Sequence, residues 1–248
     1  MTYREIIYSG FVGRYLYQNE QIASNAALYY GIYAVVILIC AAAAYFLGCL
    51  NFGIIISKVK YHDDIRTKGS GNAGATNMLR TYGKKMAAVT FLGDFLKAAV
   101  SVILGICLMG GVGGYVAAFS CMVGHAFPCF YGFKGGKGVA VSAAAILFLD
   151  WRVFIMLLIC FVLIVWWSKY ISLGSVTCLF MFPLLLSRMN SGRMPSIVVV
   201  IAFMMAALVI YLHRENIKRI YNGTESKVSF KSRNKDGTSE DGTDGNDG

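Results

Sequence analysis

Long apolar runs separated by short polar segments dominate this chain. Because about 20 apolar residues carry an α-helix across a bilayer, the pattern predicts an all-α, multi-pass transmembrane helical bundle of about seven spans. The run at residues 139–149 is short. We expect its helix either to begin inside the protein or to lie tilted where the membrane is thin. The predicted spans cover residues 30–57, 86–109, 112–130, 139–149, 153–167, 171–186 and 195–212.

The two ends of the chain differ from this apolar middle. Residues 1–29 form an N-terminal extension that begins aromatic-rich but charged and lacks the pattern of a signal peptide. We expect the start of this extension to be interfacial or loosely ordered. Residues 226–248 contain Gly, Asp, Ser, Thr and Lys without apolar periodicity, which predicts a disordered polar tail. The membrane domain is therefore predicted to be residues 30–225.

Composition and charge support a membrane protein. The chain is 57% hydrophobic and its mean hydropathy is +0.59, which excludes an ordinary soluble domain. The net charge of +10 does not indicate nucleic-acid binding, because the cations lie between the apolar runs, as topology signals do. If the first interhelical segment is cytoplasmic, 17 of the 23 Lys and Arg residues lie on that side. The positive-inside rule then places the N-terminus outside and the C-terminus in the cytoplasm.

The usual sequence patterns for metals and nucleotides fail here. The seven cysteines form no CxxC pair and are expected to be small buried hydrophobes. Gly69, Gly71 and Gly74 fit GxGxxG, but a dinucleotide fold would need a strand before them. Neither a P-loop nor a GxSxG sequence is present. We predict no metal and no cofactor.

The densest polar segment is KGSGNAGATNMLR, residues 68–80. It combines three glycines, two amides and two hydroxyls between Lys68 and Arg80. Glycines let backbone N–H groups approach an anion closely, and amide and hydroxyl side chains add donors. A tight interhelical turn is the simpler alternative, but so many donors between two cations favour an anion site.

Two further polar motifs follow. FKGGKG, residues 133–138, leads directly into the short apolar helix predicted at residues 139–149. A helix N-terminus offers free N–H groups and partial positive charge, which suit a phosphate; a positively charged turn at the membrane surface is the alternative. HRENIKRIYNGTE, residues 213–225, begins with His213, the best candidate to accept a proton near neutral pH. With an odd number of spans, all three motifs lie on the cytoplasmic face.

A few polar residues lie within the predicted spans. Asp94 and Lys97 are three residues apart, so they share a helix face and can form an ion pair that points into the bundle. A structural pair and a role beside the site both remain open. His125 is favoured as a hydrogen-bonded packing residue over a catalyst. Ser172 could cap a helix or line a site, and the cap is favoured.

The motifs GSGNAGATNMLR, GFKGGKG and HRENIKRIYNGTE together resemble the three signature motifs of the bacterial membrane acyl-phosphate:glycerol-3-phosphate acyltransferases. Their order and the apolar runs between them also match, and the similarity covers residues 45–225. The resemblance implies transfer of a fatty acyl group from acyl-phosphate to the sn-1 hydroxyl of glycerol 3-phosphate. Lysophosphatidic acid and phosphate would be the products, in the first step of phospholipid biosynthesis. One departure is GCLNFG at residues 48–53, where the family commonly reads GSIPFG, so the proline that would kink the chain is missing.

The resemblance also implies where the protein lies and what it meets. It would be a multi-pass protein of the bacterial cell membrane, with its active site on the cytoplasmic face. Its partners would be glycerol 3-phosphate, acyl-phosphate and membrane lipid, and a soluble acyl-phosphate-forming enzyme is a candidate partner. No nucleic acid is expected.

The matching motif positions carry the expected roles. The catalytic candidates are Ser70, Arg80, His213 and Asn216. The substrate-binding candidates are Asn72, Thr76, Lys134, Gly135, Gly136, Lys137, Gly138 and Ser175. Glu225 is similar to a family glutamate with a structural role.

The chemistry expected of these residues is positioning and electrostatics. We hypothesise that Arg80 and Lys137 neutralise two phosphates and that the glycine amides hold one of them. His213 would orient the attacking hydroxyl or take its proton, with a substrate phosphate as the alternative base. A small-anion transporter and a scaffold without chemistry are the rival functions. Both are disfavoured, because the sequence shows no internal repeat and carries three donor-rich loops.

Overall fold

The computed structural model describes residues 3–190 and 194–227, and in these residues every regular element is a helix. This confirms the predicted all-α class. The α-helices are α1 (Tyr3–Gln18), α2 (Glu20–Ala23), α3 (Ala26–Cys49), α4 (Phe52–Tyr61), α5 (Ala75–Ala126), α6 (Val139–Leu149), α7 (Trp151–Ser168), α8 (Ile171–Met189), α9 (Ser196–Leu212) and α10 (Arg214–Tyr221). Two 3₁₀ turns lie at Ile65–Thr67 and Cys129–Tyr131.

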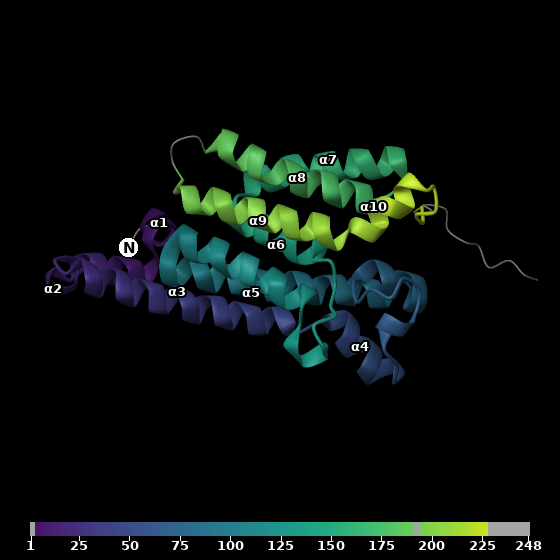
Figure 1. Ribbon diagram of the computed structural model, residues 1–248, viewed down its shortest axis with the longest axis horizontal. Coiled ribbons are helices and arrows are strands. Elements are labelled where there is room, and N and C mark those ends of the chain that lie inside the picture. The colour runs from purple at the N-terminus through teal and green to yellow at the C-terminus, as the bar shows by residue number, and fades with distance from the viewer. Residues whose placement is uncertain (1–2, 191–193, 228–248) are drawn as a thin grey trace, which may run out of the picture.

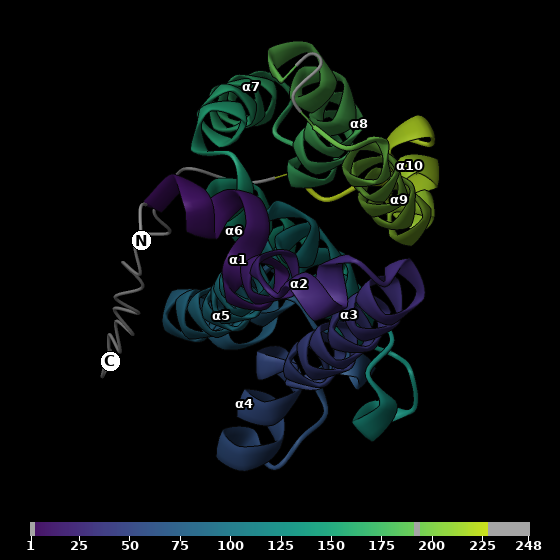
Figure 2. The same ribbon diagram turned by 90° about the vertical axis from the view of Figure 1, so that its left-hand side faces the viewer.

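The long helices run side by side, and α6 lies between two groups of them (Figure 1). Helices α3 and α5 lie on one side of α6, and α7, α8 and α9 lie on the other, as the end-on view in Figure 2 shows. Small buried residues such as Ala118, Ala144 and Ala145 form part of the core around α6. Close helix approach through small side chains is typical of membrane bundles.

The apolar helices support the multi-pass prediction. Within the described residues, four helices are long and apolar enough to cross a membrane, or five if the bent pair α9–α10 is one span. Helix α5 contains 52 residues, which is more than twice the length that a bilayer needs. Its backbone leaves the helical conformation at Met109 and Gly110, and a β-carbon on Gly105 would lie 2.4 Å from the carbonyl oxygen of Gly113. The element is therefore a helical hairpin, which turns between the predicted spans 86–109 and 112–130. The count of seven spans stays a prediction.

The first apolar run is not one continuous helix. Helix α3 ends at Cys49, and α4 begins at Phe52, so the predicted span 30–57 is divided near its end. The break forms without a proline because a buried ammonium group stabilises it: Lys97 Nζ donates to the carbonyl oxygens of Gly48 at 2.9 Å and Leu50 at 2.7 Å. These are carbonyls that a helix end leaves without intrahelical partners.

The described part of the N-terminal extension forms helices α1 and α2, and α1 is interrupted at Gly10. Helices α1 and α2 lie at the end of the molecule opposite α4 and α10 (Figure 1), and α1 packs against α5. Leu16 is buried, and Gly10 approaches the backbone of Leu108 and Gly110. Most of the predicted polar tail, residues 228–248, lies outside the described residues.

Candidate functional site

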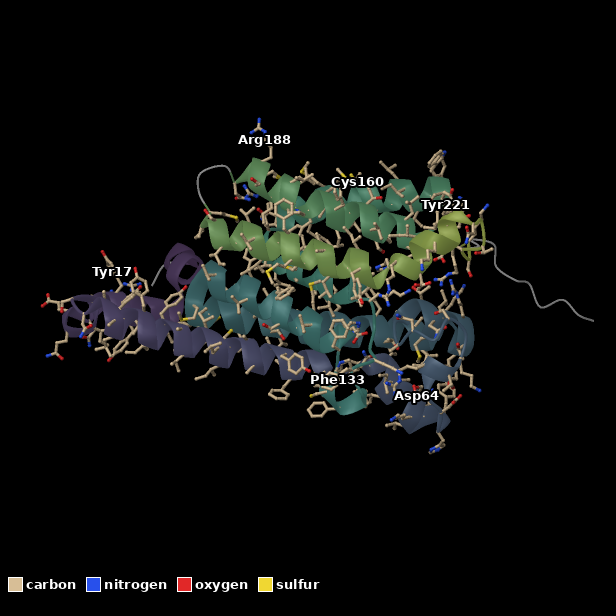
Figure 3. The ribbon with its side chains drawn as sticks, in the orientation of Figure 1. Tyr17, Asp64, Phe133, Cys160, Arg188 and Tyr221 are labelled. Atoms are coloured by element: carbon tan, nitrogen blue, oxygen red, sulfur yellow. The ribbon has the colours of Figure 1, made fainter. Side chains whose placement is uncertain are left out.

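A cavity of about 420 Å³ lies where the three polar motifs meet. Its walls come from the loop before α5, the first turns of α5, α6 and α8, and the segment from His213 to Lys227. Figure 3 shows nitrogen atoms gathered at this end of the molecule, between α10 and the start of α5. Ten predicted site residues line the cavity: Ser70, Asn72, Thr76, Arg80, Lys137, Gly138, Ser175, His213, Asn216 and Glu225. Lys134, Gly135 and Gly136 do not line it.

The first motif is held in shape by Asn77. Its Oδ1 accepts a hydrogen bond from the Ser70 amide at 2.9 Å, and its Nδ2 donates to the carbonyls of Ile65, Lys68 and Asn72. Gly69 has φ +56°, and a β-carbon there would lie 2.2 Å from Asn77 Oδ1. The glycine therefore lets the loop fold over the amide. Asn77 is buried and was not among the predicted site residues.

Arg66 joins the first motif to the second. Its Nη1 donates to the carbonyl oxygens of Tyr131 at 2.6 Å and Lys134 at 3.1 Å, while Asp64 pairs with the same guanidinium. Lys134 thus contributes a backbone carbonyl to this contact, and the residue is exposed. This arrangement gives no support to the predicted substrate-binding role of Lys134.

The glycine turn of the second motif does not leave its backbone amides free, as an anion-binding turn would. The amides of Gly135 and Gly136 donate to the carbonyls of Ala126 and His125, at 3.0 and 3.1 Å, so they are not free to bind an anion. The free donors lie slightly later in the chain. The Ser142 amide donates to the carbonyl of Gly138, which leaves the first amides of α6 without intrahelical partners, and Val139 and Ala140 line the cavity. The amides at the N-terminus of α6 are therefore better placed to bind an anion than the expected amides of Gly135 and Gly136.

Lys137 is fixed by a chain of polar contacts that crosses the cavity wall. Its ammonium donates to Asn216 Oδ1, and Asn216 Nδ2 donates to Glu225 Oε1 at 2.6 Å. Glu225 also accepts from Ser172 Oγ at 2.8 Å and Arg219 Nε at 2.7 Å. Every oxygen of this buried carboxylate is therefore used within the protein. The contacts support a structural role for Glu225.

Ser172 and Arg219 belong to these polar contacts but were not among the predicted site residues. Ser172 was expected to cap a helix, but Tyr170 is the N-cap of α8 and Ser172 binds Glu225 instead. Arg219 is predicted from its sequence context only as one more cation of the third motif. Its position, six residues after His213 and six residues before Glu225, is the one available signal.

Electrostatics make the cavity suitable for anions. Burial and the nearby cations Arg219, Arg80 and Arg214 together lower the pKa of Lys137 to about 8, although Glu225 acts in the opposite direction. A bound phosphate would relieve this repulsion. Among the described residues, no group of three or more His, Cys, Asp or Glu side chains could hold a metal ion.

His213 has a defined tautomer. The residue follows the last turn of α9 and is buried, and its Nδ1 lies 2.8 Å from the Val209 carbonyl oxygen. Since a carbonyl can only accept, Nδ1 carries the proton and Nε2 has a free lone pair. Burial lowers the pKa of His213 to about 4, so the imidazole is neutral at pH 7. Nε2 is thus able to accept a hydrogen bond or a proton.

The remaining predicted residues have local partners. Ser175 Oγ donates to the Ile171 carbonyl at 2.9 Å, and Asn72 Oδ1 accepts from the Gly74 amide at 2.8 Å. The predicted pair of Asp94 and Lys97 is confirmed, with 2.9 Å between Oδ1 and Nζ. Asp94, for which a role beside the site was left open, and His125, which was favoured as a packing residue, also line the cavity.

Comparison with known proteins identifies the family to which the chain is similar. A family model described as glycerol-3-phosphate acyltransferase matches residues 38–223. A glycerol-3-phosphate acyltransferase of Syntrophomonas wolfei subsp. wolfei is 43% identical over 187 residues, which cover 75% of this chain and 94% of that protein. One of Clostridioides difficile is 42% identical over 200 residues, which cover 78% and 96%.

Two solved structures resemble the chain. Both are crystal structures of PlsY (YgiH), an integral membrane glycerol 3-phosphate acyltransferase, one in the glycerol 3-phosphate form and one in the lysophosphatidic acid form. The first has a TM-score of 0.73 and 35% identity and covers 78% of this chain and 96% of its own. The second has a TM-score of 0.70 and 34% identity, with 78% and 95% covered.

Proposed function

Because this chain belongs to the glycerol-3-phosphate acyltransferase family, we propose that it transfers a fatty acyl group from an acyl-phosphate to the sn-1 hydroxyl of glycerol 3-phosphate. The products are lysophosphatidic acid and inorganic phosphate. One observation carries the proposal: Arg80, Lys137 and the N-terminus of α6 surround a single cavity that His213 also lines. Two phosphoryl groups need such a concentration of positive charge, and a hydroxyl attack needs a nearby acceptor.

The proposed mechanism needs no acyl-enzyme. An acyl-phosphate is a mixed anhydride, so the glycerol hydroxyl attacks its carbonyl carbon, the new ester C–O bond forms and the bond to the phosphate oxygen breaks. Arg80, Lys137 and the α6 amides stabilise the phosphate charges before and during the transfer. His213 Nε2 accepts the hydroxyl proton or orients that hydroxyl while a substrate phosphate accepts it. In this mechanism the protein positions the two substrates and stabilises their charges.

The cavity also offers a route for the acyl chain. Its apolar lining includes Leu79, Phe91 and Phe161, and Leu79 and Phe91 are exposed on the outside of α5. In a bilayer, exposed apolar side chains of a spanning helix face lipid. We propose that the acyl chain lies along this wall with its end in the bilayer, while the phosphates lie at the polar end.

The site is proposed to face the cytoplasm of a bacterial cell, with the protein in the cell membrane. There it would receive glycerol 3-phosphate from solution and acyl-phosphate from a soluble acyl-phosphate-forming enzyme. A small-anion transporter lacks support, because the polar residues that surround the cavity belong to three motifs at one end of the bundle.

The purified protein tests this function directly. With palmitoyl-phosphate and glycerol 3-phosphate, we expect lysophosphatidic acid and equimolar phosphate, and no product with acyl-CoA or acyl carrier protein as donor. Arg80→Ala should lower kcat/KM by about 100-fold or more, as removal of a group that stabilises transition-state charge does. Lys84→Ala is the matched control, because Lys84 is an exposed cation of the same helix outside the cavity. Product from acyl-CoA alone, or an unchanged Arg80→Ala, would contradict the proposal.

A further inference from the structure

His125 is a second histidine of the cavity, and its Nε2 has no partner inside the protein. The residue is only 3% exposed, yet it lines the cavity. In the described part of the chain, no hydrogen bond to Nε2 occurs, while Nδ1 lies 2.9 Å from Lys97 Nζ. A ring nitrogen without a protein partner, in a residue that lines a cavity, indicates a contact with what the cavity holds.

The Lys97 contact determines which nitrogen of His125 carries the proton. A lysine ammonium has donors and no acceptor, so Nδ1 must be the acceptor in this contact and the proton of the neutral ring lies on Nε2. Gly48 O, Leu50 O and Asp94 Oδ1 also lie 2.7–2.9 Å from the ammonium, so its three N–H groups are shared among four acceptors. Asp94 Oδ1 is farther from Nδ1, at 3.5 Å. Nε2 of His125, the ring nitrogen without a protein partner, is therefore an N–H donor.

The ring also has a fixed position beside the second motif. A β-carbon on Gly136 would lie 2.2 Å from His125 Nε2, so only glycine allows the ring to lie against the turn that precedes Lys137. The His125 carbonyl accepts hydrogen bonds from the Gly136 amide at 3.1 Å and Asn51 Nδ2 at 3.2 Å. The donor is thus held from both its ring and its backbone.

We propose that His125 Nε2–H donates a hydrogen bond to a phosphoryl oxygen of a substrate bound in this cavity. The inference rests on the proposed function for the identity of that substrate. It gives the two histidines of the cavity opposite roles: His213 presents an acceptor at Nε2, and His125 presents a donor at Nε2. Lys97 is the positioning residue that keeps the His125 donor in place.

Two substitutions of His125 distinguish a hydrogen-bond donor to the substrate from a residue that only holds Lys97. The amide of His125→Asn can occupy the place of Nδ1 and accept from Lys97, but it does not reach the position of Nε2. The amide of His125→Gln reaches the position of Nε2 and can donate there. Because a hydrogen bond to a charged group contributes strongly to binding, we expect the KM of one substrate to be about tenfold higher in His125→Asn than in His125→Gln. The substrate whose KM rises identifies the phosphoryl group involved.

The opposite results overturn the inference. If His125→Gln is the more impaired variant, or if the two folded variants have equal KM values, His125 serves only to hold Lys97. Thermal stabilisation by glycerol 3-phosphate and by inorganic phosphate gives a binding measurement that does not depend on acyl transfer. The stabilisation should be smaller for His125→Asn than for His125→Gln with at least one of the two ligands.

A measurement on the unsubstituted protein covers the case in which these variants do not fold. The chain contains three histidines, so ¹⁵N-histidine labelling yields few signals, and His62→Gln and His213→Gln assign the His125 resonance by elimination. Glycerol 3-phosphate or inorganic phosphate should shift the protonated Nε2 signal of His125, and an unmoved signal at saturation overturns the inference. If phosphate shifts the signal but no acyl transfer occurs, the proposed function fails and the donor assignment survives.

Discussion

At the residue scale, Lys137 should determine the upper pH limit of activity. Its pKa is lowered to about 8, so the ammonium is present below this pH and is lost as the pH rises through it. Because the charge is needed to bind phosphate, we expect kcat/KM to fall above about pH 8. His213, with a pKa lowered to about 4, is already a neutral acceptor over the range from about 4 to 8.

Lys137→Arg tests this assignment through the shape of the pH profile. An arginine keeps its charge at every accessible pH. The variant should be slower, because the contact with Asn216 changes, but its alkaline decline should move upward by at least one pH unit. The pH dependence of kcat/KM for both forms provides the measurement. A decline that stays near pH 8 in the variant would mean that another group titrates there.

Sequence reasoning found the site residues that carry charge or a distinctive motif, but it missed their supports. Arg80, Lys137 and His213 were predicted from the motifs, and the structure brings them to one cavity. Arg66 and Asn77 were missed because their role depends on contacts with carbonyls that only the folded chain brings near. His125 was read as a packing residue, since neither the Lys97 contact nor the cavity is visible in the sequence.

At the element scale, short glycine contacts hold the helices around the site. A β-carbon on Gly53, in the first turn of α4, would lie 1.9 Å from the carbonyl oxygen of Ala73 in the first motif. Gly48 and Gly124 make similar backbone approaches between α3 and α5. The helices can therefore approach so closely only where a side chain is absent.

We expect Gly53→Ala to displace the first motif from α4. Forcing a methyl group into this contact should cost about 1–3 kcal/mol of stability, and turnover should fall because Ser70 and Arg80 move with the loop. Gly31→Ala is the control, since nothing lies within 4 Å of a β-carbon at that position of α3. Thermal unfolding and acyl-transfer rates of the two variants test this. Equal values for both would show that the α4 contact is easily relaxed.

Helix boundaries could be predicted from the sequence where they depend on residues nearby in the chain. The predicted helix at residues 139–149 has the same bounds in the structure, because a glycine turn and an apolar run specify both of its ends. The turn at Gly110 also falls between two predicted spans. The break after Cys49 was not predicted, because it depends on Lys97, an ammonium almost 50 residues away in sequence.

At the scale of the whole molecule, the cation distribution predicts an orientation that the structure makes testable. Tyr17 and Tyr221 lie at opposite ends of the molecule (Figure 3), and both are well exposed. With the N-terminus outside, Tyr17→Cys should react with a membrane-impermeant maleimide in intact cells, and Tyr221→Cys should react only after permeabilisation. The parent chain gives the background labelling. The reverse pattern would place the candidate site on the outer face.

The hairpin of α5 has a consequence for how the two substrates are held apart. Its outgoing arm begins at Ala75, in the first motif, and its returning arm ends at Ala126, beside the glycine turn. Both proposed anion-binding walls of the cavity therefore adjoin one long element, which is interrupted at Gly83 and doubles back at Met109 and Gly110, next to the contact of Gly105 with Gly113. We expect the spacing between the proposed phosphate sites to depend on this contact, which lies outside the lining of the cavity. Any side chain that widens this crossing would separate acyl donor from acceptor without touching either one.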